Sequence, residues 1–275
     1  MKSMVLRMEV RLLFSYVDKQ IKGRLEGDGR LIYLDQEGKP VPADMESKSF
    51  ISLMGPIPIP RKIGDKTVTF NWYPFVRRVE LRHVLNCARQ VSAGGEEAFR
   101  ALLQNNMSVN SVLATQNFKD LANPLVRVHS CCMTGDVFGS MRCECGPQLN
   151  ESFARVADEG GAIVYMSGHE GRGIGMWAKA VTYMLQDEGQ DTYQANVSLG
   201  LPEDSRDFAD AAIALKYLLG GKPIRLLSNN PLKLKHLVSN GQPVSETVSL
   251  VTGINDHNIT YLRSKRSKGH NLPEI

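Results

Sequence analysis

After about residue 140, segments whose apolar residues recur at helical spacing alternate with short apolar runs. This pattern predicts that helices and strands alternate along the chain. A helix is predicted behind Pro147, a residue suited to a first helical position, because apolar residues repeat at helical spacing until a Glu-Gly-Gly sequence ends the run. Those apolar residues are Leu149, Phe153, Val156 and Ala157. The apolar run 162–166 predicts a short buried strand. Further helices are predicted at 176–189, 207–221 and 232–241, and further strands at 223–228 and 244–251.

The first hundred or so residues follow a different pattern. Segment 23–42 predicts hairpins with turn signals, 55–75 predicts a proline-broken β segment, and 79–90 and 95–106 predict two helices. The fold class we predict is therefore α/β, a layered mixed β-sheet flanked by helices, with an N-terminal α+β extension. We predict two regions, an N-terminal accessory region at 1–107 and a core at 108–275 whose functional loops lie at strand ends.

The composition narrows the class of protein. Hydrophobic residues make up 42% of the chain and charged residues 23%, as in globular proteins. The longest apolar runs fall far short of the roughly 18 to 20 residues that cross a bilayer, and charges interrupt the N-terminal stretch, which no small-residue cleavage site follows. We predict a cytoplasmic protein with no membrane association. The net charge of +4 suits a phosphorylated ligand but is too small to indicate nucleic acid.

Four of the five cysteines lie within fifteen residues, which suits a reducing compartment and a metal site better than a disulfide framework. The single residue between Cys143 and Cys145 lets both thiolates bind one ion from a tight turn that Gly146 helps to fold. Cys132 reaches the same ion if the ten residues between it and Cys143 form a compact loop. Catalytic zinc sites commonly have three protein ligands and an open position, whereas structural sites are closed by four. We therefore favour an open zinc site that activates water for hydrolysis.

Two alternatives to the open site remain at this point. His129 and Cys131 lie close to Cys132 in the sequence, and either could supply the fourth ligand of a closed structural site. The chain could also bind no metal.

The Gly-rich sequence HEGRGIG follows a predicted strand and precedes a predicted helix. The amides of Gly171, Gly173 and Gly175 suit phosphate oxygens near a helix N-terminus. Glu170 and Arg172 in the same loop could read a polar base or a phosphate. A glycine-rich turn with a solvated ion pair is an equal alternative on the pattern alone.

Other polar residues have an ordinary interpretation on pattern alone. Asp204 and Arg206 suit an N-cap with a surface salt bridge at a helix start, and Tyr183 suits a core position. Lys233 is less ordinary, because a cation in the first turn of a helix opposes the helix dipole unless an anion is also present. The residues by themselves thus predict a zinc hydrolase of the α/β class that acts on something phosphorylated.

Five segments, in order, resemble the GTP cyclohydrolase II family, whose enzymes open riboflavin synthesis. They are "RVHSCCMTGDVFGSMRCECGPQL", "GHEGRGIG", "TYMLQDEGQDTYQANVSLGLPEDSRDF", "RLLSNNPLK" and "SLVTGINDHNITYLRSKRSKGH". The resemblance covers about residues 123–270. Five ordered motifs, one of them a three-cysteine zinc signature, are far more specific than any one alone.

The resemblance implies a zinc ion held by Cys132, Cys143 and Cys145, magnesium with the triphosphate, and a homodimer. Asp204 would be the proton acceptor, Arg206 the nucleophile toward the α-phosphate, and Tyr183 would position or activate the attacking water. The residues implied to bind GTP are Arg127, Val128, His129, Ser130, Cys131, Gln148, Glu170, Gly171, Arg172, Thr192, Ser228 and Lys233. The implied reaction releases formate and pyrophosphate and leaves a diaminopyrimidinone ribosyl phosphate. Because arginine is almost always protonated, charge stabilisation is the easier role for Arg206.

The sequence departs from the family pattern at two positions and in its long N-terminal region. Cys131 stands where family members commonly have glutamate, and Ser167 where an arginine is usual. These departures keep alternatives open: a divergent paralogue that gives a formylated pyrimidine or acts on another nucleotide, and a non-catalytic GTP-binding sensor. A zinc-stabilised nucleic-acid module is a further alternative, although one cysteine cluster without an aromatic-basic stripe is a poor footprint for it. Retention of every implied metal and catalytic residue favours the enzyme.

Overall fold

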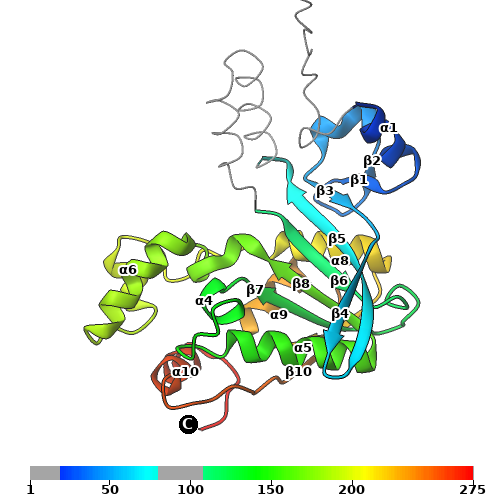
Figure 1. Ribbon diagram of the computed structural model, residues 1–275. Coiled ribbons are helices and arrows are strands. Elements are labelled where there is room, and N and C mark those ends of the chain that lie inside the picture. The colour runs from blue at the N-terminus through cyan, green and yellow to red at the C-terminus, as the bar shows by residue number, and fades with distance from the viewer. Residues whose placement is uncertain (1–18, 80–107, 275) are drawn as a thin grey trace, which may run out of the picture.

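The computed structural model of the chain describes residues 19–79 and 108–274 (Figure 1). The two helices predicted at 79–90 and 95–106 lie outside these residues, apart from residue 79, and so does the predicted boundary at residue 107. The division into an accessory region and a core therefore stays a prediction.

Ten strands form one mixed sheet, which confirms the predicted α/β class. The strands are β1 (Leu31–Leu34), β2 (Pro40–Val41), β3 (Ile51–Met54), β4 (Ile57–Ile63), β5 (Lys66–Arg77), β6 (Asn110–Ala114), β7 (Leu125–Ser130), β8 (Gly161–Met166), β9 (Ile224–Leu227) and β10 (Val244–Val248). Their order is β10-β9-β7-β8-β6-β5-β3-β1-β2, with β4 paired to β5. Strands β10, β9, β7 and β8 are mutually parallel, and the remaining pairs are antiparallel. The N-terminal strands thus continue the sheet of the C-terminal half.

The helices in the described residues are α1 (Lys19–Gly27), η2 (Ala43–Lys48), α4 (Met133–Asp136), α5 (Cys145–Glu159), η3 (Ser167–Arg172), α6 (Gly175–Asp187), α7 (Gln194–Ser198), α8 (Ala209–Leu219), α9 (Pro231–Ser239) and α10 (Ile259–Ser267). None of them is both long and apolar enough to span a bilayer. The helices and strands predicted after residue 140 are all present. Asn230 caps α9, because its side chain accepts a hydrogen bond from the Leu232 amide and Pro231 follows it.

The N-terminal prediction needs two corrections. Residues 23–27 belong to helix α1 and not to a hairpin. Segment 55–75 is not broken by its prolines, because β4 and β5 pair along their whole shared length. Pro58 and Pro60 are exposed and lie on β4, which pairs only with β5 in the described sheet. A proline is tolerated on such an edge, since its missing N–H removes no ladder hydrogen bond there.

Alternation along the central strands separates two apolar layers. Val126 and Val128 of β7 pack into the larger core, together with buried side chains of α8 and α9. Leu125 of the same strand packs on the other face with Phe153 and Val156 of α5. The sheet is therefore covered on both faces, as a parallel segment requires. Arg127 and His129 follow Leu125 at intervals of two, so the strand period places them on the α5 face.

The carboxyl ends of the parallel strands β7, β8 and β9 lie at one edge of the sheet, followed by α4, η3 and α9 respectively (Figure 1). Helix α6 stands away from the sheet at the left of Figure 1. In an open α/β sheet this edge is the usual position of a ligand site.

Candidate metal centre and cationic pocket

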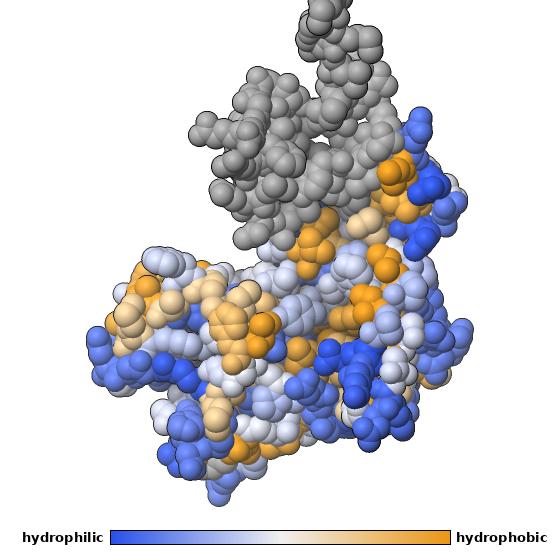
Figure 2. All heavy atoms as spheres, in the orientation of Figure 1, coloured by the Kyte–Doolittle hydropathy of each residue, from blue (hydrophilic) through white to orange (hydrophobic). Residues whose placement is uncertain are grey.

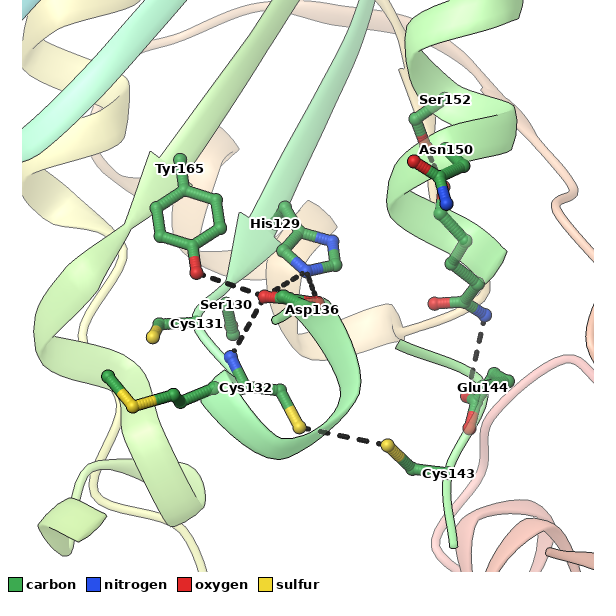
Figure 3. Close-up of polar contacts among 12 residues, drawn as sticks. His129, Ser130, Cys131, Cys132, Asp136, Cys143, Glu144, Asn150, Ser152 and Tyr165 are labelled. Carbon is green, nitrogen blue, oxygen red and sulfur yellow. Dashed lines mark hydrogen bonds and ion pairs between the residues drawn. The ribbon is translucent and has the colours of Figure 1, made fainter. Parts of the chain in front are cut away.

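Three cysteine side chains meet at this edge of the sheet. The Sγ atoms of Cys132, Cys143 and Cys145 lie within 4.8 Å of one another, and Cys132 Sγ lies 3.7 Å from Cys143 Sγ (Figure 3). Ligands about 2.3 Å from a tetrahedral zinc ion place their sulfur atoms about 3.8 Å apart. The cluster therefore fits a zinc ion both in chemistry and in spacing.

No fourth cysteine, histidine or carboxylate joins the cluster within residues 19–79 and 108–274. His129 Nε2 instead lies 3.0 Å from Asp136 Oδ1, and the Cys131 thiol donates to Glu170 at 3.7 Å. Both side chains that could have closed the site are thus engaged elsewhere. Within the described residues, the cluster therefore offers three ligand atoms to a metal ion.

Two glycines allow the cysteine segments to approach each other. A Cβ on Gly135 would lie 2.9 Å from Cys143 Sγ and 3.3 Å from Cys132 Sγ. A Cβ on Gly146 would lie 2.4 Å from the carbonyl oxygen of Gly135. Because real Cβ atoms essentially never approach within 3.0 Å of such atoms, α4 and the start of α5 can pack this closely only with glycine at both positions.

Asp136 holds the Cys132 loop against the sheet (Figure 3). Its carboxylate accepts hydrogen bonds from the Tyr165 hydroxyl and from the Cys132 amide, both at 3.0 Å, and contacts His129 Nε2. Asp136 and His129 are almost fully buried. The carboxylate therefore joins β7 and β8 to the loop that carries the first cysteine.

We expect Asp136→Asn to destabilise the metal-free protein by about 2 to 3 kcal/mol, because it weakens several buried hydrogen bonds to a charged group. Urea unfolding measures this change. Asp187→Asn is the matched control: Asp187 forms an exposed ion pair with Arg142, and such pairs contribute only about 0 to 1 kcal/mol. Equal unfolding midpoints for the two variants would contradict the anchoring role of Asp136.

A pocket beside the thiol cluster gathers the residues predicted from the sequence. Every predicted metal, catalytic and binding residue lines it except Val128 and Asp204. Val128 is fully buried in the apolar core, and its carbonyl oxygen accepts a hydrogen bond from Lys233 Nζ at 2.7 Å. Asp204 does not line the pocket, but it is ion-paired with Arg206, which does.

The pocket is strongly cationic. Its lining includes the basic residues Arg127, Arg142, Arg172, Lys179, Arg206, Lys233 and Lys265, against a single carboxylate, that of Glu170. Burial lowers the pKa of Lys233 well below its ordinary value, and the charges of Arg127 and Arg206 lower it further. Burial likewise lowers the pKa of Arg127 to about 10. Such a concentration of positive charge suits a ligand that carries several negative charges.

Asp204 and Arg206 lie in the loop before α8 and not at a helix start. Asp204 accepts from Arg206 Nε at 2.8 Å and Nη2 at 2.5 Å, and the Arg206 Nη1 donates to Ser130 Oγ at 3.3 Å. Their side chains are 17% and 12% exposed, so the expected surface pair is wrong. Burial alone would lower the pKa of Arg206, but the Asp204 carboxylate outweighs it and the pKa is raised. Arg206 is therefore a fixed cation in the pocket.

The Gly-rich turn differs from the expected amide cradle. Gly173 and Gly175 do not line the pocket, and the Gly173 amide donates to the Glu170 carbonyl oxygen at 2.9 Å. The Gly171 amide donates to the Glu170 carboxylate at 3.1 Å. Arg172 adopts a left-handed backbone conformation, φ 62°, and donates to Thr192 Oγ1 at 2.5 Å. The turn therefore contributes the side chains of Glu170 and Arg172 to the pocket lining, and the amides of Gly171 and Gly173 are already hydrogen-bonded within the turn.

The two departures from the family pattern have different surroundings. Burial raises the pKa of the Cys131 thiol to about 11, so Cys131 is neutral where glutamate would carry a charge. Ser167 does not line the pocket, and its amide donates to Asn110 Oδ1 at 3.0 Å. Only Cys131 changes the pocket lining directly.

Sequence reasoning missed several pocket residues, among them Arg142, His169, Lys179, Tyr261, Lys265 and His270. Lys179 follows the polar pattern of an amphipathic helix, and nothing in that pattern separates it from a solvated lysine. Tyr261, Lys265 and His270 come from α10 and the segment after it, which the resemblance included without assigning any role. The pattern of hydrophobic residues does not predict that a segment near the C-terminus packs against the pocket.

The fold and the site together define an α/β protein in which a three-thiol cluster that could hold a metal ion lies at the carboxyl ends of parallel strands, beside a pocket lined by several cationic side chains. The pattern of the GTP cyclohydrolase II family matches residues 90–249, more than half of the chain, so the chain belongs to this family.

Proteins named riboflavin biosynthesis protein RibBA match a little more than half of the chain. That of Rhodococcus jostii (strain RHA1) is 52% identical over 155 residues, which cover 56% of this chain and 37% of the relative. That of Mycobacteroides abscessus is 53% identical over 153 residues, covering 55% of this chain and 36% of the relative. The aligned region thus spans little more than a third of the length of these relatives.

Proposed function

We propose that this protein is a zinc-dependent GTP cyclohydrolase that opens the imidazole ring of GTP and releases formate and pyrophosphate in riboflavin biosynthesis. The observation that carries the proposal is the open three-thiol cluster on the wall of a strongly cationic pocket. Family membership supports the same reaction. Magnesium with the triphosphate also follows from the family resemblance, and the cytoplasmic location stays a prediction from the sequence.

Cys132, Cys143 and Cys145 would hold the zinc ion. When bound there, zinc would supply a Lewis acid that activates water for attack on the imidazole carbon between the two ring nitrogens. Tyr183 would orient that water; in support, it lines the pocket and its hydroxyl lies 3.0 Å from Thr134 Oγ1 beside the cysteine cluster. Burial raises the pKa of Tyr183, so the hydroxyl stays protonated and can donate a hydrogen bond.

Arg127, Lys233 and Arg206 would bind the triphosphate and stabilise charge on it. Arg127 donates to Leu227 O and Gln148, and Lys233 donates to a backbone carbonyl, so within the described part of the chain neither has a carboxylate partner. Neither side chain is therefore neutralised by an ion pair with a described residue, and a bound anion would raise the lowered pKa of Lys233 and favour its charged form. Arg206 would stabilise charge at the α-phosphoryl group, because Asp204 keeps it protonated and so disfavours it as a nucleophile. The Asp204 carboxylate stays ionised, since Arg206 holds its pKa low against the opposing effect of burial, and it could accept a proton.

Glu170 and Gln148 would read the base. Both are buried side chains in the pocket lining, and amide or carboxylate groups can pair with the donor and acceptor edge of guanine. Cys131 contacts Glu170 and would tune this part of the pocket.

Incubation with GTP before and after zinc removal tests the proposal. Zinc- and magnesium-replete protein should release formate and pyrophosphate, chelated protein should lose formate release, and added zinc should restore it. Tight GTP binding without turnover would instead support a nucleotide sensor. Salt-dependent binding of DNA or RNA without GTP turnover would favour the nucleic-acid alternative.

We propose that the protein forms a homodimer, as the family resemblance implies. Apolar side chains gather over α4 and α6, at the left of the face in Figure 2. Trp177 is 87% exposed, and Val137, Phe138 and Met184 are exposed by more than half. A second copy of the chain would cover these side chains. So many exposed apolar side chains close together are unusual on a monomeric protein and commonly mark an interface.

Trp177→Glu is expected to weaken such a dimer by about 30-fold or more, since a tryptophan at the centre of an interface commonly contributes at least about 2 kcal/mol. Sedimentation equilibrium measures the association. Val238→Glu is the control, because Val238 is an exposed apolar residue on α9. A monomeric wild-type protein, or equal association of both variants, would refute this interface.

A further inference from the structure

A buried lysine joins the thiol cluster to the substrate pocket. Lys179 of α6 is 7% exposed. Its Nζ donates to Cys132 Sγ at 3.2 Å, to Thr134 Oγ1 at 2.9 Å and to Glu170 Oε1 at 2.6 Å. The three contacts use the three donor hydrogens of an ammonium group. None of the steps proposed above uses Lys179.

The first of these contacts concerns the charge of the metal centre. Three thiolates and one divalent ion carry a net charge of −1, which is costly in a buried site without a compensating cation. Among hydrogen bonds between described residues, that of Lys179 is the one in which a cationic side chain donates to a cluster sulfur. Groups that hydrogen-bond to metal ligands tune the metal and commonly affect its affinity.

The other two contacts connect the metal loop to the residues that face the substrate. Glu170 also accepts from the Met133 amide at 2.6 Å, so the Lys179–Glu170 pair ties the cysteine loop to the Gly-rich turn. Thr134 Oγ1, which accepts from Lys179, also lies 3.0 Å from the Tyr183 hydroxyl, within hydrogen-bond distance. Movement of Lys179 would therefore disturb the metal ligand, the base-reading carboxylate and the tyrosine together.

We propose that Lys179 is a positioning residue that neutralises the thiolate of Cys132 and fixes Glu170 relative to the metal. This inference rests on the proposed zinc site, and it assigns the lysine a role that a simple fold-stabilising ion pair would not have. A charged hydrogen-bond donor withdraws electron density from the sulfur. The metal bound to Cys132 should therefore report whether the lysine is present.

Cobalt(II) substitution provides the direct measurement, because thiolate-to-cobalt charge-transfer absorption responds to electron density on sulfur. In Lys179→Met this band should move to longer wavelength, since Cys132 becomes a stronger electron donor, and Lys179→Arg should restore part of the shift. Zinc affinity, measured by competition with a chelator, should fall about 10-fold or more in Lys179→Met. The KM for GTP should rise as Glu170 loses its anchor.

Lys222→Met is the matched control, because Lys222 donates to the Lys119 carbonyl oxygen at the surface and does not line the pocket. It should leave the absorption band and the zinc affinity unchanged. If Lys179→Met does not fold, Lys179→Gln, which keeps N–H donors without the charge, gives the same comparison with a smaller expected shift.

The outcomes separate the two proposals. If the wild-type protein binds neither zinc nor cobalt, the proposed zinc site fails, and the inference fails with it. If the wild-type protein binds both, but the folded Lys179 variants keep its band position and zinc affinity, the zinc site stands and the role of Lys179 is overturned.

Discussion

Cys143→Ser should lose zinc and should release formate from GTP at least about 10³-fold more slowly than the wild-type protein. The serine hydroxyl is a poor zinc ligand at neutral pH, and two remaining thiols cannot hold the ion in the geometry that three provide. In the proposed reaction, loss of the metal would remove the Lewis acid that activates water for the ring opening, an effect worth several kcal/mol. Zinc content and formate release measure the two effects independently.

In the same Cys143→Ser variant, GTP binding and pyrophosphate release serve as internal controls. Apart from Arg142, which directly precedes Cys143, the cations of the pocket lie on other segments, from Arg127 on β7 to Lys233 on α9, so GTP should still bind. Release of pyrophosphate can then be compared directly with release of formate, because the proposal assigns the phosphate step to the cations and the ring step to the metal. If Cys143→Ser retains both zinc and formate release, the metal assignment is wrong.

Arg206→Ala should lower pyrophosphate release by about 10² to 10³-fold, the usual effect of removing one preorganised donor to a developing charge. Arg206→Lys should recover about a tenth of the wild-type rate, because it keeps the positive charge but loses the two-pronged contact with Asp204. Rapid-quench assays of pyrophosphate measure both variants. Folding is checked by thermal unfolding of each.

The comparison of these two substitutions separates charge stabilisation from nucleophilic attack by Arg206. A nucleophilic arginine would form a covalent bond to the α-phosphorus and would appear in the mass spectrum of the quenched protein as a nucleotide adduct. Charge stabilisation predicts no such adduct and partial rescue by lysine. A trapped adduct on Arg206, with no rescue by lysine, would contradict the role proposed here.

The order of helices and strands after residue 140 was predictable because its physical causes are local. Pro147 lies in the first turn of α5, which begins two residues earlier than its expected first position, Gly160 ends that helix, and strand β8 is an uninterrupted apolar run. The three-cysteine cluster was predictable for the same reason, since close spacing in the sequence limits how far apart the sulfurs can lie.

Features that depend on contacts distant in sequence were not predictable. Arg206 and Asp204 have the pattern of a surface pair, but both are largely buried. The loop that carries them is hydrogen-bonded to the distant Gly-rich turn, from the Ser205 amide to the Arg172 carbonyl oxygen. Lys179 has the pattern of a solvated helix face, yet it reaches a sulfur 47 residues away in the chain. Residues 23–27 contain two glycines, which favoured a turn, but they form the end of α1.

The most direct test of the central claim is the mass of the nucleotide product after GTP is incubated with zinc- and magnesium-replete protein. We predict a diaminopyrimidinone ribosyl phosphate that has lost both formate and pyrophosphate. Unchanged GTP would contradict the proposed enzyme. A product that keeps the formyl group would contradict complete hydrolysis and would direct attention to Cys131, the departure from the family pattern that lies in the pocket.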